Sequence, residues 1–354
     1  MRVLVTRPDE LGQAEIDAWR AMQGATAALG NPFLSPEFAI AAARFRPAAR
    51  VAVLAGARSA KGFFPFERHR FGIGAPVCGW LSLGQGLIHA PGVEWDSQEL
   101  LRGCGLAVWQ FDHLVAGQQP FLPYQEATAP SPVIDLADGF AAYYARLRAR
   151  APQFCRELER KARKLARDAG ELHFVADSRD PSVLRALMTW KSQQYHRTGL
   201  VDRFGLPWVT GLLETLLATR GDHLSGMLSG LYADGQLVAA QFGLRSGKLF
   251  AGWFTAYDDR FGRYSPGLIQ VLRLAEALAA AGVELIDMGK GPAAYKERLK
   301  DRDNVVAEGI VTGRSALAAV HRARRASARW AGVTLSRHPR LYRATRPFRT
   351  ARRR

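Results

Sequence analysis

The chain has 354 residues, of which 48% are hydrophobic and 23% charged, and a formal net charge of +17. This composition excludes a disordered chain and fits a globular protein with room for two domains. No apolar run is long enough to cross a bilayer, and the opening residues MRVLVTRPDELG read as a strand rather than as a signal peptide.

Cysteines and histidines predict neither a disulfide framework nor a metal site. Cys78, Cys104 and Cys155 are odd in number and share no spacing typical of metal ligands. The eight histidines are scattered as well. Cysteines without a pairing pattern fit a reducing compartment, so we expect a cytoplasmic protein that holds no metal.

The N-terminal half alternates between strand and helix patterns. RVLVT, at 2–6, reads as a strand, and helices are expected at 9–22 and 35–45. The pattern then predicts a hairpin (50–56 and 62–70), a third strand (75–83), a helix (97–105) and a further strand (107–115).

A basic connector follows. Residues 141–170 contain nine basic and three acidic residues and predict a helix that is interrupted near Pro152. One interpretation is a solvated helix in which Glu157 and Glu159 pair with neighbouring lysines and arginines. The other is a surface that holds an anionic substrate, because such a helix would border the groove between two domains.

The C-terminal half has a clearer pattern. It predicts a strand (171–177), two helices (180–199 and 207–221), three strands within 226–258, a helix (265–281), a strand (283–289), a short helix (293–300) and a strand (305–313). Asp234-Gly235 marks the first hairpin turn between the three strands. This element order resembles the Gcn5-related N-acetyltransferase (GNAT) fold, and the N-terminal half reads as a fainter copy of it.

The stretch DDRFGRYSPG, 258–267, joins the last of the three strands to the long helix. Ser265 is expected as the N-cap and Pro266 as the first helical residue, since the cap oxygen satisfies an otherwise unpaired N–H and proline has none. A capped helix start is the simpler interpretation. The alternative is an anion site, because free N–H groups and the positive end of the helix dipole favour a phosphate.

The C-terminal segment 314–354 carries thirteen arginines and no acidic residue, with Trp330, Tyr342 and Phe348 among them. Such a segment suits an anionic membrane surface or single-stranded nucleic acid. A solvated tail without a partner is the alternative. The basic residues are concentrated here and in the connector, so the overall charge is weak evidence for a nucleic-acid-binding fold.

Five segments together resemble the acetyltransferases of the cellulose-biosynthesis type (CelD/BcsL), which are related to the Fem aminoacyltransferases. They are NPFLSPEFAIAAARF, the basic connector, WKSQQYHRTG, YDDRFGRYSPG and IDMGKGPAAYKERL. The most specific part is YSPG followed by Asp287, Gly291, Tyr295 and Lys296. The usual GNAT pyrophosphate signature is only approximated, by Arg260, Arg263 and Gly267.

The resemblance implies an α/β protein with a mixed sheet (α+β) and tandem GNAT-like acyltransferase domains, Fem-like, with a basic connector helix and a basic tail. We expect an N-terminal GNAT-like domain at 1–140, the connector at 141–170, the acyltransferase domain at 171–313 and the Arg-rich tail at 314–354. The family acts near envelope polysaccharide assembly, which favours peripheral attachment of the tail to the inner membrane face.

The resemblance also implies a binding site for acetyl-CoA or another acyl-CoA. Backbone N–H groups between Phe254 and Tyr257 would bind the acyl carbonyl. The phosphates would lie at the helix start. The residues expected to contact the donor are Phe254, Tyr257, Arg260, Arg263, Tyr264, Ser265, Pro266 and Gly267. A capped helix with solvated arginines is the alternative.

Catalytic and acceptor residues are expected on the elements around this site. Tyr295 would be the general acid for the leaving thiolate, Lys296 would hold the oxyanion or an anionic group, and Asp287 would act as a base or orient the acceptor. Each of the three could instead be structural. The residues expected to line the acceptor groove are Lys191, Gln194, Tyr195 and Asp258, for which an ordinary polar surface is the alternative.

The sequence therefore predicts an acyltransferase that modifies an amino or hydroxyl group of an envelope or exopolysaccharide precursor. Two alternatives remain. One is a Fem-like transferase that takes its acyl group from aminoacyl-tRNA, the one case in which nucleic acid would be a partner. The other is a scaffold without catalytic activity that binds a polysaccharide synthase at the membrane.

Overall fold

A computed structural model describes residues 2–56, 59–291, 293–313 and 318–319. Nearly all of the predicted tail, 314–354, lies outside these residues. The helices are α1 (Gln13–Gly24), α2 (Pro36–Ala43), α3 (Ser97–Gly103), α4 (Gly139–Arg150), α5 (Pro152–Ala169), α6 (Pro181–Thr198), α7 (Pro207–Ala218), α8 (Pro266–Ala280) and α9 (Ala294–Leu299). No helix in the described ranges is long and apolar enough to cross a membrane.

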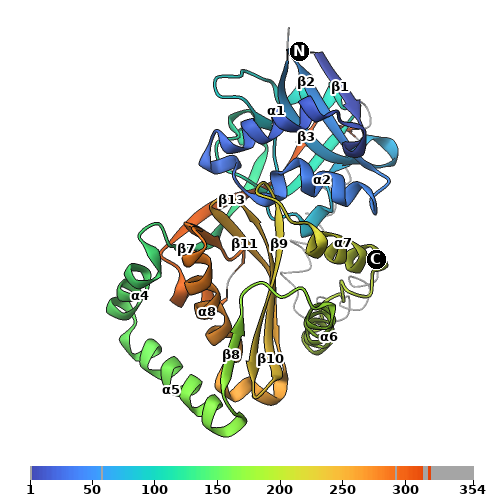
Figure 1. Cartoon of the computed structure of the whole chain (residues 1–354). Helices are drawn as coiled ribbons and strands as arrows, with labels where there is room; N and C mark the ends of the chain where they lie inside the picture. Colours follow the sequence, from blue (N-terminus) through green and yellow to red (C-terminus); the bar gives the residue numbers. More distant parts are fainter. Residues whose placement is uncertain (1, 57–58, 292, 314–317, 320–354) are drawn as a thin grey trace, which may run out of the picture.

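The strands form one continuous mixed sheet that runs through two lobes (Figure 1). They are β1 (Arg2–Thr6), β2 (Ala49–Ala55), β3 (Ala60–Arg68), β4 (Ile73–Ala75), β5 (Ile88–His89), β6 (Val108–Leu114), β7 (Gln125–Asp135), β8 (Leu172–Val175), β9 (Ser225–Ala233), β10 (Gln236–Ser246), β11 (Leu249–Tyr257), β12 (Leu285–Asp287) and β13 (Arg302–Thr312). The order is β1-β2-β3-β4-β6-β13-β7-β12-β11-β10-β9-β8, and β5 pairs with β3.

Two strands are exchanged where the lobes meet. β13, from the C-terminal end of the described chain, pairs with β6 of the N-terminal lobe on one side and with β7 on the other. β7 in turn pairs with β12 of the C-terminal lobe. The hydrogen bonding of the sheet therefore continues across the limits of the two predicted domains, 1–140 and 171–313. The division into these domains stays a prediction.

The mixed α/β fold is confirmed, and each strand and helix expected in the C-terminal half is present. In the N-terminal half, the strand expected at 75–83 is wrong. β4 ends at Ala75, and the chain then turns through a 3-10 helix at Gly79–Leu81. Cys78 and Gly79 have φ angles of 62° and 55°, a left-handed conformation that a strand does not contain.

β7 is the longest of the strands that the sequence pattern did not predict. It contains Pro130 and Pro132, which are unusual inside a strand because proline cannot donate to a ladder. β12 pairs with β7 only at Val133–Asp135, so the segment that contains the two prolines has β13 as its one paired strand. On the other edge the Pro132 carbonyl accepts a hydrogen bond from the Met288 N–H, a contact that requires no N–H from proline.

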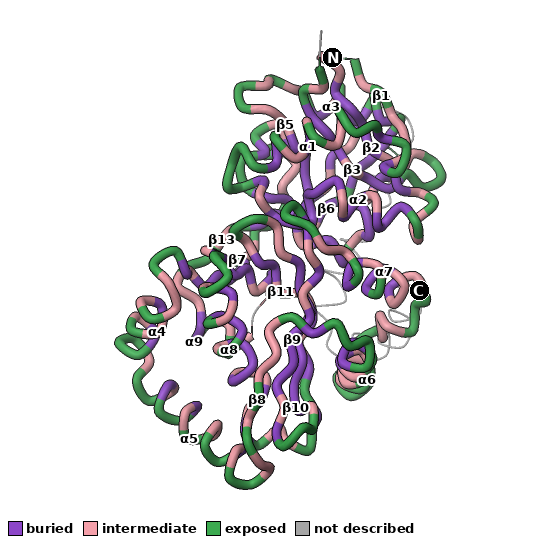
Figure 2. The backbone as a smooth tube through the Cα atoms, viewed as in Figure 1, coloured by how far each residue is buried: buried purple, intermediate pink, exposed green. Residues whose placement is uncertain are grey.

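The largest apolar core is shared by both lobes. Phe33, Phe38 and Leu81 from the N-terminal lobe pack with α6, α7, β10 and β11. Figure 2 shows buried residues continuing along the central strands from one lobe to the other, whereas α5 at the lower edge is largely exposed or intermediate. The two lobes are therefore expected to unfold together.

Phe38 is fully buried against the rings of Phe33 and Trp253. We expect Phe38→Ala to lower the free energy of unfolding by about 3–5 kcal/mol, through lost burial and a residual cavity. Urea unfolding followed by circular dichroism and by tryptophan fluorescence should give a single coincident transition. Leu122→Ala, at a half-exposed leucine, is the matched control and should change little. Two separate transitions in the wild type would contradict the shared core.

Candidate functional site

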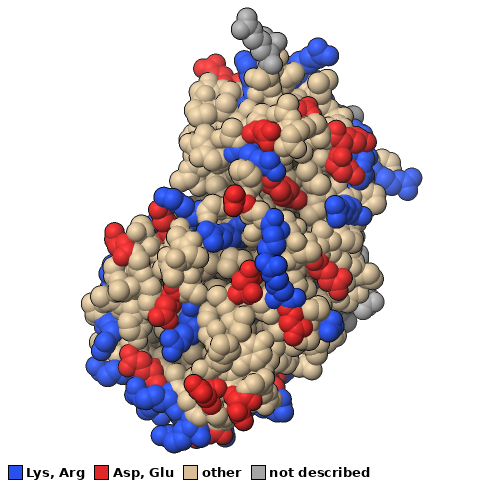
Figure 3. Space-filling model, viewed as in Figure 1, with Lys and Arg blue, Asp and Glu red and all other residues tan. Residues whose placement is uncertain are grey.

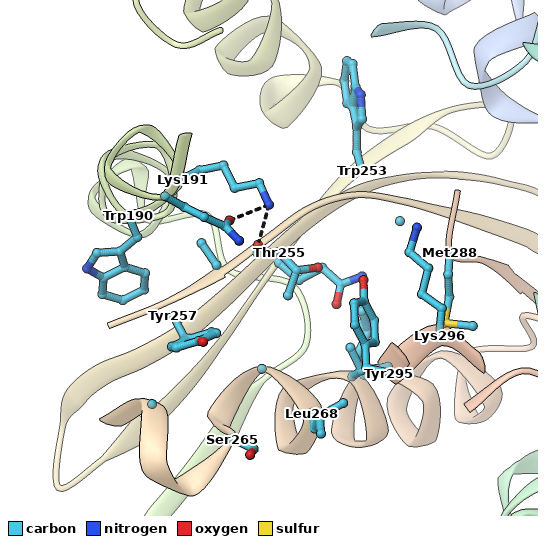
Figure 4. Close-up of a pocket in the computed structure, with 18 of the residues that line it drawn as sticks. Trp190, Lys191, Trp253, Thr255, Tyr257, Ser265, Leu268, Met288, Tyr295 and Lys296 are labelled. Carbon is cyan, nitrogen blue, oxygen red and sulfur yellow. Dashed lines mark hydrogen bonds between the residues drawn. The ribbon is translucent and has the colours of Figure 1, made fainter. Parts of the chain in front are cut away.

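The site is an opening between β11 and β12. The two strands run parallel and pair only at Leu249–Ala251 with Leu285–Asp287. Beyond this point β11 continues to Tyr257 with β10 on one edge. In the described part of the chain no strand pairs with its other edge. A cavity of about 480 Å³ lies here, with walls from α6, β10, β11, the start of α8, β12 and α9 (Figure 4).

A β-bulge in β11 borders the cavity. Phe242 pairs with Phe254 and Gly243 pairs with Gly252, so Trp253 is the extra residue. Its ring packs edge-on against Phe33 of the N-terminal lobe, with centroids 4.9 Å apart. In Figure 4 it points away from α8. The N-terminal lobe thus holds the irregular stretch of β11 in place.

The start of α8 differs from a simple capped helix. A 3-10 helix at Asp259–Tyr264 precedes it, and Ser265 has a left-handed conformation with φ 55°. The Ser265 side chain makes no capping bond, so the expected cap is wrong in its chemistry although its position is right. Instead, Oγ of Ser265 accepts a hydrogen bond from Nζ of Lys161 on α5, at 3.0 Å.

Of the residues predicted to contact the donor, Tyr257, Ser265 and Gly267 line the cavity. The other predicted donor residues, which are Phe254, Arg260, Arg263, Tyr264 and Pro266, are not among its lining residues. The Arg260 guanidinium binds the carboxylate of Asp258, with Nη2 2.6 Å from Oδ2. Arg263 donates to the Tyr264 hydroxyl, which in turn donates to Asp168.

Asp258 and Asp259 have different surroundings. Asp258, predicted to line the acceptor groove, lies outside the cavity lining and caps the 3-10 helix by accepting from the Arg260 N–H. Asp259, which sequence reasoning missed, lines the cavity and pairs with Arg197 of α6.

Tyr295 and Lys296 line the opposite wall, on α9. Lys296 Nζ donates to the Gly289 carbonyl at 2.8 Å. Burial lowers the pKa of Lys296, although the nearby Asp287 acts in the other direction. Tyr295 as a residue is 36% exposed, and partial burial raises the pKa of its hydroxyl. The phenol therefore stays protonated at neutral pH and can donate a proton.

Asp287 is buried beside the cavity and is not part of its lining. Its Oδ1 accepts hydrogen bonds from Ser131 Oγ of β7 at 2.6 Å and from the Gly289 N–H at 2.8 Å. Burial raises the pKa of Asp287, against these two bonds. The contacts tie the end of β12 to β7 and to the turn before α9.

Lys191 and Gln194 line the cavity from α6. Lys191 Nζ donates to Gln194 Oε1 at 2.9 Å and to the Thr255 carbonyl at 3.3 Å (Figure 4). Burial, together with the positive charges of Lys296 and Arg203, lowers the pKa of Lys191 to about 8. Tyr195, the third residue predicted on this helix, is buried and stacks on Phe204.

Gln241 of β10 is a lining residue that sequence reasoning missed. It is 5% exposed, and its carbonyl oxygen has no hydrogen-bond partner in the described part of the structure. A side chain at Gly252 would bring a Cβ within 3.0 Å of Gln241 Nε2, so the glycine keeps the amide open to the cavity. The signal in the sequence was a polar residue within the apolar strand LVAAQFGL.

The described residues contain no group of three or more His, Cys, Asp or Glu side chains that could hold a metal ion.

Comparison with known proteins agrees with this geometry. Residues 152–297 match the family described as Acetyltransferase (GNAT) domain. No curated protein matches the chain. One similar solved structure is the C-terminal domain of a putative lysylphosphatidylglycerol synthetase from Agrobacterium fabrum, with 14% identity, TM-score 0.54, and coverage of 87% of this chain and 94% of that one. Another is FemX, with 8% identity, TM-score 0.53, and coverage of 88% and 96%.

At these identities the structural likeness establishes the fold. The chain has the tandem GNAT-like architecture that FemX shares, and the GNAT match spans α5 to α9, which includes the parted strands and the start of α8.

Lys191 offers a direct test of the cavity's electrostatics. With its pKa near 8, about half of the Lys191 amine is neutral at pH 8, against under about 1% for a lysine with the ordinary pKa near 10.4. We expect Lys191 to react with a small acetylating reagent faster than exposed Lys248 at this pH, measured by mass spectrometry of the peptides. Equal rates at both lysines would contradict the lowered pKa.

Asp287 predicts a pH dependence of stability. Because its pKa is raised in the folded state, the folded protein binds the proton more tightly than the unfolded chain. The resulting stabilisation is complete below the unfolded pKa of about 3.9 and is lost as the pH rises through the folded pKa. The Asp287→Asn variant does not titrate there, so its unfolding free energy should rise relative to wild type with increasing pH. Urea titrations over this range measure the difference; a difference that falls with pH would show that the carboxylate is stabilised as the anion.

Proposed function

We propose that this chain is an acyltransferase of the CelD/BcsL type. It would move an acyl group, acetyl in the simplest case, from acyl-CoA to an amino or hydroxyl group of an envelope or exopolysaccharide precursor. The observation that carries the proposal is the parting of β11 and β12, which leaves one edge of β11 open in a cavity between the start of α8 and the pair Tyr295 and Lys296.

In this proposal the thioester carbonyl lies against the open edge of β11 between Gly252 and Tyr257, whose backbone N–H groups stabilise the oxyanion. The acceptor nitrogen or oxygen attacks the carbonyl carbon, a C–N or C–O bond forms, and the C–S bond breaks. Tyr295 donates its proton to the leaving thiolate and regains one from the acylated nitrogen or oxygen. The phosphates lie toward Ser265 and Gly267, at the positive end of α8.

A second candidate is a Fem-like transfer from aminoacyl-tRNA, favoured by the basic face of α5. Arg156, Arg160, Arg163 and Lys164 are exposed on this helix. In Figure 3 basic side chains gather along the lower left edge, where α5 runs in Figure 1. Lys161 on the same helix reaches Ser265, so a polyanion on α5 would lead to the start of α8. We further propose that the segment 314–354 binds the inner membrane face.

The donor is tested by calorimetric titration of the full chain with acetyl-CoA. We expect micromolar binding that is weakened at least about tenfold in Gly267→Glu, which places a negative charge at the helix start. Gly24→Glu, at the exposed end of α1 with nothing near its Cβ position, is the matched control and should bind as wild type does. If neither acetyl-CoA nor longer acyl-CoAs bind, the acyl-CoA proposal is wrong and aminoacyl-tRNA is the next donor to titrate.

A further inference from the structure

Three basic side chains lie near one another at the cavity. Lys191 of α6 and Lys296 of α9 line it. Arg203, from the segment between α6 and α7, lies beside Lys191, because the Arg203 guanidinium and the Lys191 amine are 5.9 Å and 5.7 Å from the centroid of the same Tyr195 ring. The two lysines donate to an amide or carbonyl oxygens, as described above. The Arg203 guanidinium lies 3.7 Å from the ring centroid of Trp80, which belongs to the N-terminal lobe. None of the three pairs with a carboxylate among the described residues.

The three positive charges act on one another. Those of Lys296 and Arg203 both lower the pKa of Lys191, and burial lowers the pKa of all three groups. Like charges that are partly removed from water repel each other and are solvated poorly. Such an arrangement is unfavourable in isolation and becomes favourable when an anion enters.

The nearby carboxylates do not neutralise this group. The charge of Asp287 raises the pKa of Lys296, but the hydrogen bonds of this carboxyl group go to Ser131 and Gly289. The charge of Asp112 raises the pKa of Arg203, but the hydrogen bonds of this carboxylate are with Gln85 and His113.

Asp202 is next to Arg203 in the chain but bonds to Ser192 and lies 3.3 Å from His196. Carboxyl groups therefore lie near Lys191, Arg203 and Lys296, but none of those described forms an ion pair with them.

The cation group is also separate from the proposed phosphate position. In Figure 4 Ser265 and Leu268 lie on one side of Thr255, and the amine nitrogens of Lys191 and Lys296 lie on the other, toward Trp253. Donor and acceptor in an acyl transfer must reach the reacting carbonyl from different directions. The cation group is placed to hold the acceptor.

We propose that Lys191, Arg203 and Lys296 bind an anionic group, a carboxylate or a phosphate, of the acceptor substrate. The assignment of this anion to the acceptor rests on the proposed acyltransferase function. Arg203 can form a bidentate hydrogen-bonded contact with either anion while its guanidinium group packs against the Trp80 ring. Through Trp80 the N-terminal lobe contributes to acceptor recognition.

The test titrates the full chain with inorganic pyrophosphate and, separately, with malonate, at constant ionic strength. We expect one or both to bind, and Arg203→Gln to weaken that binding about tenfold or more, as loss of a charge-assisted contact predicts. Arg273→Gln, at an exposed arginine on α8, removes the same charge elsewhere and should leave binding unchanged. The stronger of the two probes identifies phosphate or carboxylate as the preferred group.

Two further measurements separate this site from the donor site. Arg203→Gln should bind acetyl-CoA as wild type does, and Gly267→Glu should retain the anion that Arg203→Gln loses. If anion binding is lost in Gly267→Glu and kept in Arg203→Gln, the probe occupies the start of α8 and the proposal is wrong. If Arg203→Gln does not fold, Lys191→Gln takes its place in the same comparison.

The result also distinguishes the two proposals from each other. If an anion binds in a way that depends on Arg203 and acetyl-CoA does not bind, the proposed anion site is supported and the proposal of an acyl-CoA donor is wrong. Acetyl-CoA binding without any response to pyrophosphate or malonate would keep the donor and overturn the anion site.

Discussion

The site depends on the hydrogen bonds that the buried carboxyl group of Asp287 accepts. This group accepts from Ser131 of β7 and from the N–H of Gly289, so β12 ends at this residue and the chain turns toward α9. β11 continues from there with β10 on one edge and no described strand on the other, and this unpaired edge becomes one wall of the cavity. The same turn supplies the Gly289 carbonyl that positions Lys296, so the shape of the opening and the placement of a functional side chain have one origin.

Among the described residues no strand of the N-terminal lobe pairs with β11, yet this lobe determines how the site is built. Phe33 packs against the bulged Trp253, and Trp80 packs against Arg203. Both contacts are aromatic and short-ranged, so small shifts between the lobes would move the irregular part of β11 and the Arg203 guanidinium together. This geometry gives the N-terminal lobe a role in the site whether or not it binds a ligand of its own.

Local sequence patterns predicted the C-terminal elements well because the hairpin turns contain Asp-Gly and Gly, and because α6 and α8 begin with Asp-Pro and Ser-Pro. They failed at β7, which contains two prolines, at the short β5, and at 75–83, where Cys78 and Gly79 turn the chain. Within the site, Tyr295, Lys296 and Lys191 could be found from their elements and the resemblance. The contacts of Arg203 with Trp80, of Ser265 with Lys161 and of Asp287 with Ser131 join residues far apart in the sequence, which local patterns do not encode.

The exchange of β7 and β13 has a consequence for dissecting the protein. A fragment that stops before α4 would retain β7 but lack both of its partners, and β6 would lose β13. A fragment that starts at α5 would carry β12 and β13 without the strand that joins them. Each would expose long unpaired backbone edges that can recruit other chains, so the two lobes form one unit of expression and folding.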